Sequence, residues 1–77
     1  MRIKEVCIII SFKTTTQAMA FENICENDIE GRLIPLPPII HAGCGLAWKS
    51  KLKEKRKLLD IIQEKQLSFD EIHEIEV

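Results

Sequence analysis

The residue with the clearest chemical potential in this sequence is a cysteine held between two glycines. Cys44 lies between Gly43 and Gly45, and it follows the proline-rich stretch LIPLPPII at residues 33–40. A reactive cysteine needs exposure and groups that stabilise the thiolate, which is the nucleophilic form. Flanking glycines remove two side chains and permit positive φ, so backbone amides can converge on the sulfur. The pattern favours a working thiol, although a tight turn with the cysteine packed inward fits it as well.

Three neighbours of this cysteine have side chains that can assist a thiol or hold a partner. His41 precedes Cys44 by three residues and can act as its general base, or it is a solvated loop histidine. Lys49 can add positive potential, but the sequence does not place it relative to the thiol. Trp48 can anchor a partner protein, because aromatic residues are common at binding hot spots, or it can cap a small core.

The other two cysteines, Cys7 and Cys25, fall at apolar positions, where core packing is the stronger interpretation. The three cysteines are an odd number without a C-x-x-C pair, which is neither a disulfide framework nor a zinc pattern. A metal site of Cys44, His41 and His73 would have only three ligands and no motif. We therefore expect free thiols, no metal and no cofactor.

Composition narrows the class of protein. A chain of 77 residues is expected to form one domain over 1–77 with a small core. A net charge of −1 and only three phenylalanines and one tryptophan argue against nucleic-acid binding, which needs a basic surface or a stacking platform. The longest apolar run, at 6–10, is too short for a membrane span or a signal peptide. We expect a cytoplasmic protein with reduced thiols.

Hydrophobic patterning predicts six elements of secondary structure. A run rich in β-branched residues predicts a central strand, and prolines limit the second strand to a sheet edge. A charged segment with an apolar stripe predicts the second helix. Alternation of apolar and polar residues in the tail predicts the last strand, but it does not show which face of that strand is buried. We expect strands at 3–12, 32–34, 44–49 and 70–77, and helices at 15–27 and within 49–66. The stripe of the second helix is expected to consist of Leu52, Leu58, Leu59 and Ile62, with Ile61 at its margin.

The order strand, helix, strand, strand, helix, strand predicts an α+β fold. It matches the split βαβ, ferredoxin-like arrangement, β-α-β-β-α-β, in which two helices cover one face of an antiparallel sheet. The connection between the second and third strands would then place Cys44 at one end of the sheet.

The motif around the thiol resembles that of a family of very small bacterial proteins, the selenium/sulfur carrier protein-like domains. In that family a strand ending in LIP-x-P leads through a short loop into CG-[LI]-A, matched here by residues 33–37 and 44–47. The resemblance covers nearly the whole chain. The chain departs from the family pattern in two places. Pro38 stands where family members often carry a basic residue, and Trp48 and Lys49 stand where they often carry an aliphatic residue followed by arginine.

The resemblance implies a carrier that holds sulfur or selenium on Cys44 as a persulfide or perselenide, with Gly43, Gly45 and Pro37 as the frame of the motif. Its donor would be a protein such as a cysteine desulfurase, and a carrier is favoured over a turnover enzyme. The alternative is a non-catalytic interaction module or homodimer, in which Cys44 is structural. Its contact surface would be the open face of the sheet, with Trp48 and residues 39–40. A redox sensor ranks below both, because it needs a resolving cysteine.

Overall fold

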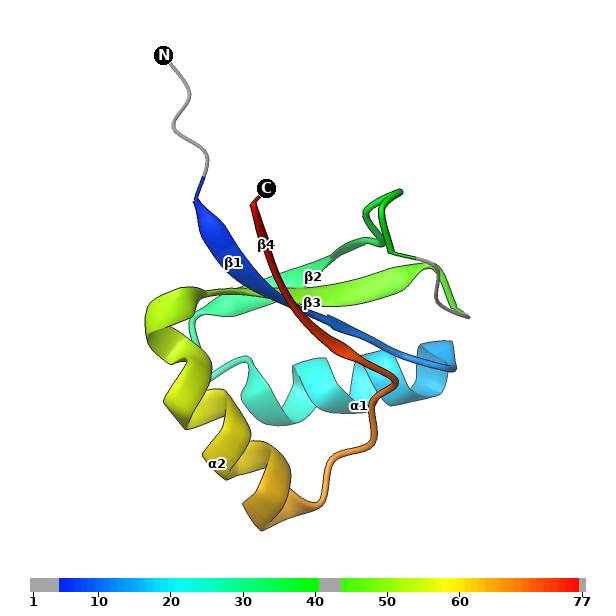
Figure 1. Cartoon of the computed structure of the whole chain (residues 1–77). Helices are drawn as coiled ribbons and strands as arrows, with labels where there is room; N and C mark the ends of the chain where they lie inside the picture. Colours follow the sequence, from blue (N-terminus) through cyan, green and yellow to red (C-terminus); the bar gives the residue numbers. More distant parts are fainter. Residues whose placement is uncertain (1–4, 41–43, 77) are drawn as a thin grey trace.

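The computed structural model describes residues 5–40 and 44–76, which form one sheet and two helices (Figure 1). The elements in chain order are β1 (Val6–Ser11), α1 (Thr15–Cys25), β2 (Gly31–Pro35), β3 (Leu46–Lys51), the 3-10 turn η1 (Leu52–Glu54), α2 (Lys55–Lys65) and β4 (Ile72–Glu76). Every neighbouring pair of strands is antiparallel, in the order β2-β3-β1-β4. The predicted α+β class and element order are confirmed, and the ferredoxin-like label stays a prediction.

The central strand β1 is apolar on both faces, which explains its continuous hydrophobic run. Ile8 and Ile10 lie on the face that carries the helices, whereas Cys7 and Ile9 lie on the opposite, open face. Burying an aliphatic side chain of this size contributes roughly 1.5–3 kcal/mol. Both faces of β1 therefore contribute to stability, although helices cover only one of them.

The larger core lies between the sheet and the two helices. Phe21 of α1 stacks at a tilt between Phe12, at 5.3 Å between ring centroids, and Trp48 of β3, at 5.7 Å. Leu58 of α2 joins the same cluster, so both helices cover one face, as predicted. Trp48 is 0% exposed, and its indole N–H donates to the Ser50 hydroxyl at 2.6 Å. The expectation that Trp48 caps the core is confirmed.

Residues 36–40, which follow β2, fold back over the open face of the sheet. The backbone N–H of Ile40 donates to the Pro37 carbonyl at 2.9 Å, which closes a turn. Ile40 is thereby buried against Cys7, Ile9 and Ala47. This second, smaller core was not predicted, and it covers part of the face that the sequence analysis left open.

Several predicted boundaries were wrong. β3 begins at Leu46 rather than at Cys44, and it ends at Lys51 rather than at Lys49. The segment predicted to hold the second helix began at Lys49, but residues 49–51 belong to β3 and residues 52–54 to η1, so α2 begins at Lys55. With this later start, Leu58 points into the core with Ile61 and Ile62 against it. Leu52 and Leu59, predicted on the buried stripe, are 42% and 44% exposed. The predicted helix at 15–27 ends two residues earlier, at Cys25.

Side-chain and backbone caps define the ends of the helices. The Thr14 hydroxyl accepts from the Gln17 N–H at 3.2 Å, and the Gln17 side chain accepts from the Lys13 N–H at 3.1 Å. This reciprocal pair fixes the start of α1. Gln66 ends α2 in the left-handed conformation, with a φ of 52°. Among the described residues, no helix combines the length and apolarity that a membrane crossing requires.

Candidate functional site around Cys44

Cys44 lies just before β3, at the edge of the larger core. Its backbone N–H donates to the carbonyl oxygen of Phe12 at 3.4 Å, and its thiol is 3.7 Å from the carbonyl oxygen of Leu46, to which it donates. The side chain is half-buried and packs against the helix-side cluster. The predicted loop cysteine is thus accessible on one side and packed on the other, which combines the two interpretations that the sequence left open.

Gly45 gives the chain its path from this cysteine into β3. Its φ is +77°, in the left-handed region that favours glycine, and open space surrounds the position that a Cβ would occupy. Its carbonyl accepts from the Leu36 N–H at 2.8 Å, and Pro35 pairs with Leu46 next to it. The glycine is therefore needed for conformation rather than for space, and it aligns the two ends of the loop.

The backbone of Cys44 is bonded to the segment that leads into α1. Phe12, whose carbonyl binds the Cys44 N–H, lies two residues before the N-cap Thr14. The first turn of α1 contains no acidic residue. A helix N-terminus carries a partial positive charge and favours anions nearby. The local electrostatics therefore favour a negatively charged group at this end of the sheet.

Two of the residues predicted to assist the thiol, His41 and Gly43, lie outside the described residues, so their roles stay predictions. Pro37 is half-buried and shapes the turn through its carbonyl. His73 lies opposite Ile9 on the open face, whereas Cys44 packs on the helix side. The structure therefore does not bring His73 to the thiol, and within the described part of the chain no three metal-binding side chains gather.

The structure places Trp48 in the core and Lys49 on the open face of the sheet. Trp48 is fully buried beneath the helices, so the prediction that it contacts a partner was wrong. Lys49 pairs with Ile9 and Arg32 on the open face, whereas Cys44 packs on the helix side. The expectation that Lys49 supports the thiol is not met by this placement.

The other two cysteines are buried, as predicted. Cys25 is 0% exposed, and burial, helped by the negative charge of Asp28, raises its pKa to about 11. Cys7 is 4% exposed and packs on the open face beside Ile9. All three cysteines are free thiols, and Cys44 is the most accessible of them.

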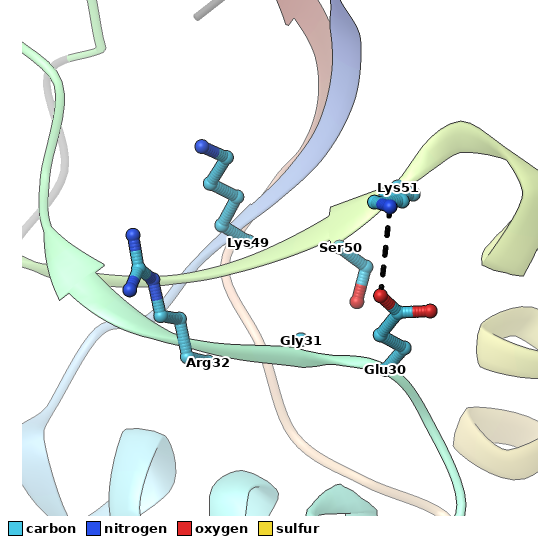
Figure 2. A pocket seen from close by; sticks show the side chains of 6 residues that line it. All are labelled: Glu30, Gly31, Arg32, Lys49, Ser50 and Lys51. Atoms are coloured by element: carbon cyan, nitrogen blue, oxygen red, sulfur yellow. Dashed lines mark ion pairs between the residues drawn. The ribbon is translucent and has the colours of Figure 1, made fainter.

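A pocket that the sequence analysis missed lies at the other end of β2 and β3 (Figure 2). Its volume is about 310 Å³, and its lining residues are Glu30, Gly31, Arg32, Lys49, Ser50 and Lys51. Arg32 and Lys49 are directly opposite in the register of β2 and β3. The sequence signal was the alternation of Lys49 and Lys51 at strand spacing, which the predicted helix concealed.

Comparison with known proteins gives one match. The sequence model of the family described as "Putative Se/S carrier protein-like" matches residues 7–74, which span every strand and helix of the fold. No curated protein and no solved structure matches the chain significantly. The matched region includes the Cys44 loop and both of its flanking strands. The chain belongs to the Se/S carrier protein-like family.

Proposed function

We propose that this protein carries sulfur or selenium on Cys44, as a persulfide or perselenide. The observation that carries the proposal is that Cys44 is the one cysteine of the three with a half-exposed side chain. The family description points to the same kind of cargo. Carriage of one atom needs an accessible thiol and no bound cofactor, so a single half-exposed cysteine suffices.

The chemistry is a transfer between sulfurs. The Cys44 thiolate attacks the outer sulfur of a donor persulfide, the donor S–S bond breaks, and the donor leaves as a thiolate. The new S–S bond holds one sulfur on Cys44, and no net oxidation occurs. An acceptor nucleophile then attacks that outer sulfur and releases the Cys44 thiolate. A cysteine desulfurase is a donor of the right chemistry. A reducing cytoplasm would keep the Cys44 thiol reduced between cycles.

The environment of Cys44 suits this cycle. Packing of one side of the side chain against the core fixes its position, while the other side stays open to a donor. The backbone N–H of Cys44 is bonded to Phe12, which ties the thiol to the junction between β1 and α1. Gly45 adds no side chain to the approach. His41 is the proposed activating base and Gly43 the second glycine of the frame.

A second candidate is a contact module that acts through the open face. Ile39, in the turn before the buried Ile40, is 73% exposed, and such an exposed aliphatic side chain next to an apolar surface favours a contact. Trp48 no longer belongs to this surface. An assembly of this kind would form a dimer that Ile39→Ser weakens and that Cys44→Ser leaves unchanged, as measured by analytical ultracentrifugation.

Intact-protein mass spectrometry tests the carrier. The reduced protein is incubated with a cysteine desulfurase and cysteine, next to Cys44→Ser and the matched control Cys25→Ser. We expect the wild type and Cys25→Ser to gain the mass of one sulfur atom, and Cys44→Ser to gain none. Loading of Cys44→Ser at the wild-type rate would contradict the proposal, and so would a wild-type protein that gains no sulfur.

A further inference from the structure

The pocket between β2 and β3 presents positive charge that no described carboxylate neutralises at its centre. Arg32 of β2 and Lys49 of β3 are opposite each other, and both project from the open face of the sheet (Figure 2). Like charges directly opposite on neighbouring strands repel and destabilise a sheet. Among residues 5–40 and 44–76, no ion pair joins a carboxylate to Arg32 or Lys49.

The one carboxylate in the pocket wall is already engaged by other lysines. Glu30 lies 3.3 Å from the Lys53 ammonium and 3.6 Å from the Lys51 ammonium. The hydrogen bond from Lys53 and then the charge of Lys51 lower the pKa of Glu30, so this carboxylate is ionised at neutral pH. Figure 2 shows its side chain turned toward Lys51 and away from Arg32. Two cations, Arg32 and Lys49, therefore remain to act on a ligand.

The backbone of β2 comes unusually close to that of β3 at this pocket. Gly31 lies between Glu30 and Arg32 and lines the pocket without a side chain. A Cβ on Gly31 would lie 2.5 Å from both the Lys49 carbonyl oxygen and the Ser50 hydroxyl, so close packing of β2 on β3 requires glycine here. The glycine therefore holds the backbone of β2 close to that of β3 at this pocket, and this fixes where Arg32 and Lys49 leave the sheet.

We propose that this pocket binds a phosphate group. Two uncompensated positive charges match a dianion better than a single carboxylate. The guanidinium of Arg32 can bind two phosphate oxygens at once, and the ammonium of Lys49 can bind a third as a point charge. The volume of about 310 Å³ corresponds to about ten water molecules at ~30 Å³ each, so the pocket accepts either the free ion or a phosphate attached to a small organic group.

This pocket is separate from the thiol. Lys49 follows Cys44 by five residues and lies on the open face of the sheet, whereas Cys44 packs against the helix-side cluster. A phosphate bound at Arg32 cannot touch the sulfur. The proposal therefore does not rest on sulfur carriage, and Cys44→Ser is expected to bind phosphate as the wild type does.

A titration followed by nuclear magnetic resonance tests the pocket. Inorganic phosphate and phenyl phosphate are added separately to the isotopically labelled protein at constant ionic strength, with chloride as the balancing anion. We expect saturable shifts of the backbone amides of Gly31, Arg32 and Lys49. The double variant Arg32→Gln/Lys49→Gln should weaken binding at least about tenfold, which corresponds to the loss of one charged hydrogen bond or more.

The matched control is Arg56→Gln/Lys65→Gln, which removes the same two charge types from the exposed surface of α2 and should change affinity less than about twofold. Tighter binding of phenyl phosphate would assign the site to a phosphorylated small molecule, and equal binding would assign it to the free ion. Equal shifts with chloride alone, or undiminished binding by the double variant, would overturn the proposal. Should the double variant not fold, Lys49→Gln alone decides, with a loss of about fivefold expected.

Discussion

The backbone N–H of Cys44 donates to the carbonyl oxygen of Phe12 at 3.4 Å, and this bond joins the β2–β3 loop to the junction between β1 and α1. The anchor uses only main-chain atoms of Cys44, so a change of its side chain leaves it in place. Cys44→Ser therefore removes the sulfur without moving the loop. On the acceptor side of this bond, the position of Phe12 is fixed by its ring, which packs on the ring of Phe21 in the core.

Stability is expected to fall in mildly alkaline solution because of Cys25. Its folded pKa is about 11 against an ordinary value of 9.0, so the folded state holds the proton more tightly than the unfolded state does. The contribution is present in full below pH 9 and is lost as the pH rises toward 11, by roughly 3 kcal/mol. Urea unfolding at several pH values measures it. Cys25→Ala should show a shallower fall over the same range, and equal slopes would contradict this assignment.

The hydroxyl of Ser50 is expected to stabilise the core through Trp48. Ser50→Ala leaves the indole N–H of Trp48 without its partner inside a fully buried site, which costs about 1–3 kcal/mol. Thermal or urea unfolding measures the loss. Ser68→Ala, at an exposed position, makes the same chemical change and should alter the free energy of unfolding by less than about 0.5 kcal/mol. Similar losses in the two variants would show that the bond contributes nothing.

The two described glycines are expected to respond differently to alanine. At Gly31 the new methyl group would press on the Lys49 carbonyl and the Trp48 ring, and overpacking of this kind costs about 1–3 kcal/mol or more. At Gly45 the methyl group meets open space, and only the positive φ is strained, at roughly 1–2 kcal/mol. We expect Gly31→Ala alone to shift the amide resonances of β3 near Ser50. An unchanged β3 in Gly31→Ala would contradict the close approach.

Replacement of Gln66 by glycine is expected to stabilise the protein. It ends α2 with a φ of 52°, a conformation that glycine adopts without strain, so Gln66→Gly should raise the free energy of unfolding by about 0.5–1 kcal/mol. The same substitution at Gln63, exposed within α2, should lower it by about 1 kcal/mol. Calorimetry of the two variants measures the change in stability, which should have opposite signs. A loss of stability in both variants would refute the argument.

The sequence predicts those elements whose period and burial agree. β1 was predicted because apolar residues on both faces leave no other interpretation of so short a run, and α1 because Ala18, Phe21 and Cys25 recur at helical spacing. The start of α2 was missed because lysines at 49, 51 and 53 fit a solvated helix face as well as the open face of a strand. Pairing with Arg32 and Ile9, which is a tertiary relation, decides between them.

The thiol was found from its motif, whereas its surroundings were not. Two glycines and a cysteine can be identified in a linear sequence, but half-burial of Cys44 depends on where Phe12 and α1 lie. The pocket around Arg32 and Lys49 depends on the register of two strands that are separated in the chain by residues 36–45. Register follows from the packing of both faces and is not encoded by either strand alone.

The uncharged strand β1 has a further consequence for the whole chain. Six residues, VCIIIS, combine high β-propensity with no charge and no proline, which is the composition of segments that form amyloid-like stacks. In the folded protein both of its edges are occupied, one by β3 and the other by β4. β4 is short, and the glutamates at 74 and 76 discourage another chain from adding to it. β4 thus protects the protein from aggregation, because a chain that lacked it would expose the unpaired edge of β1 to other molecules.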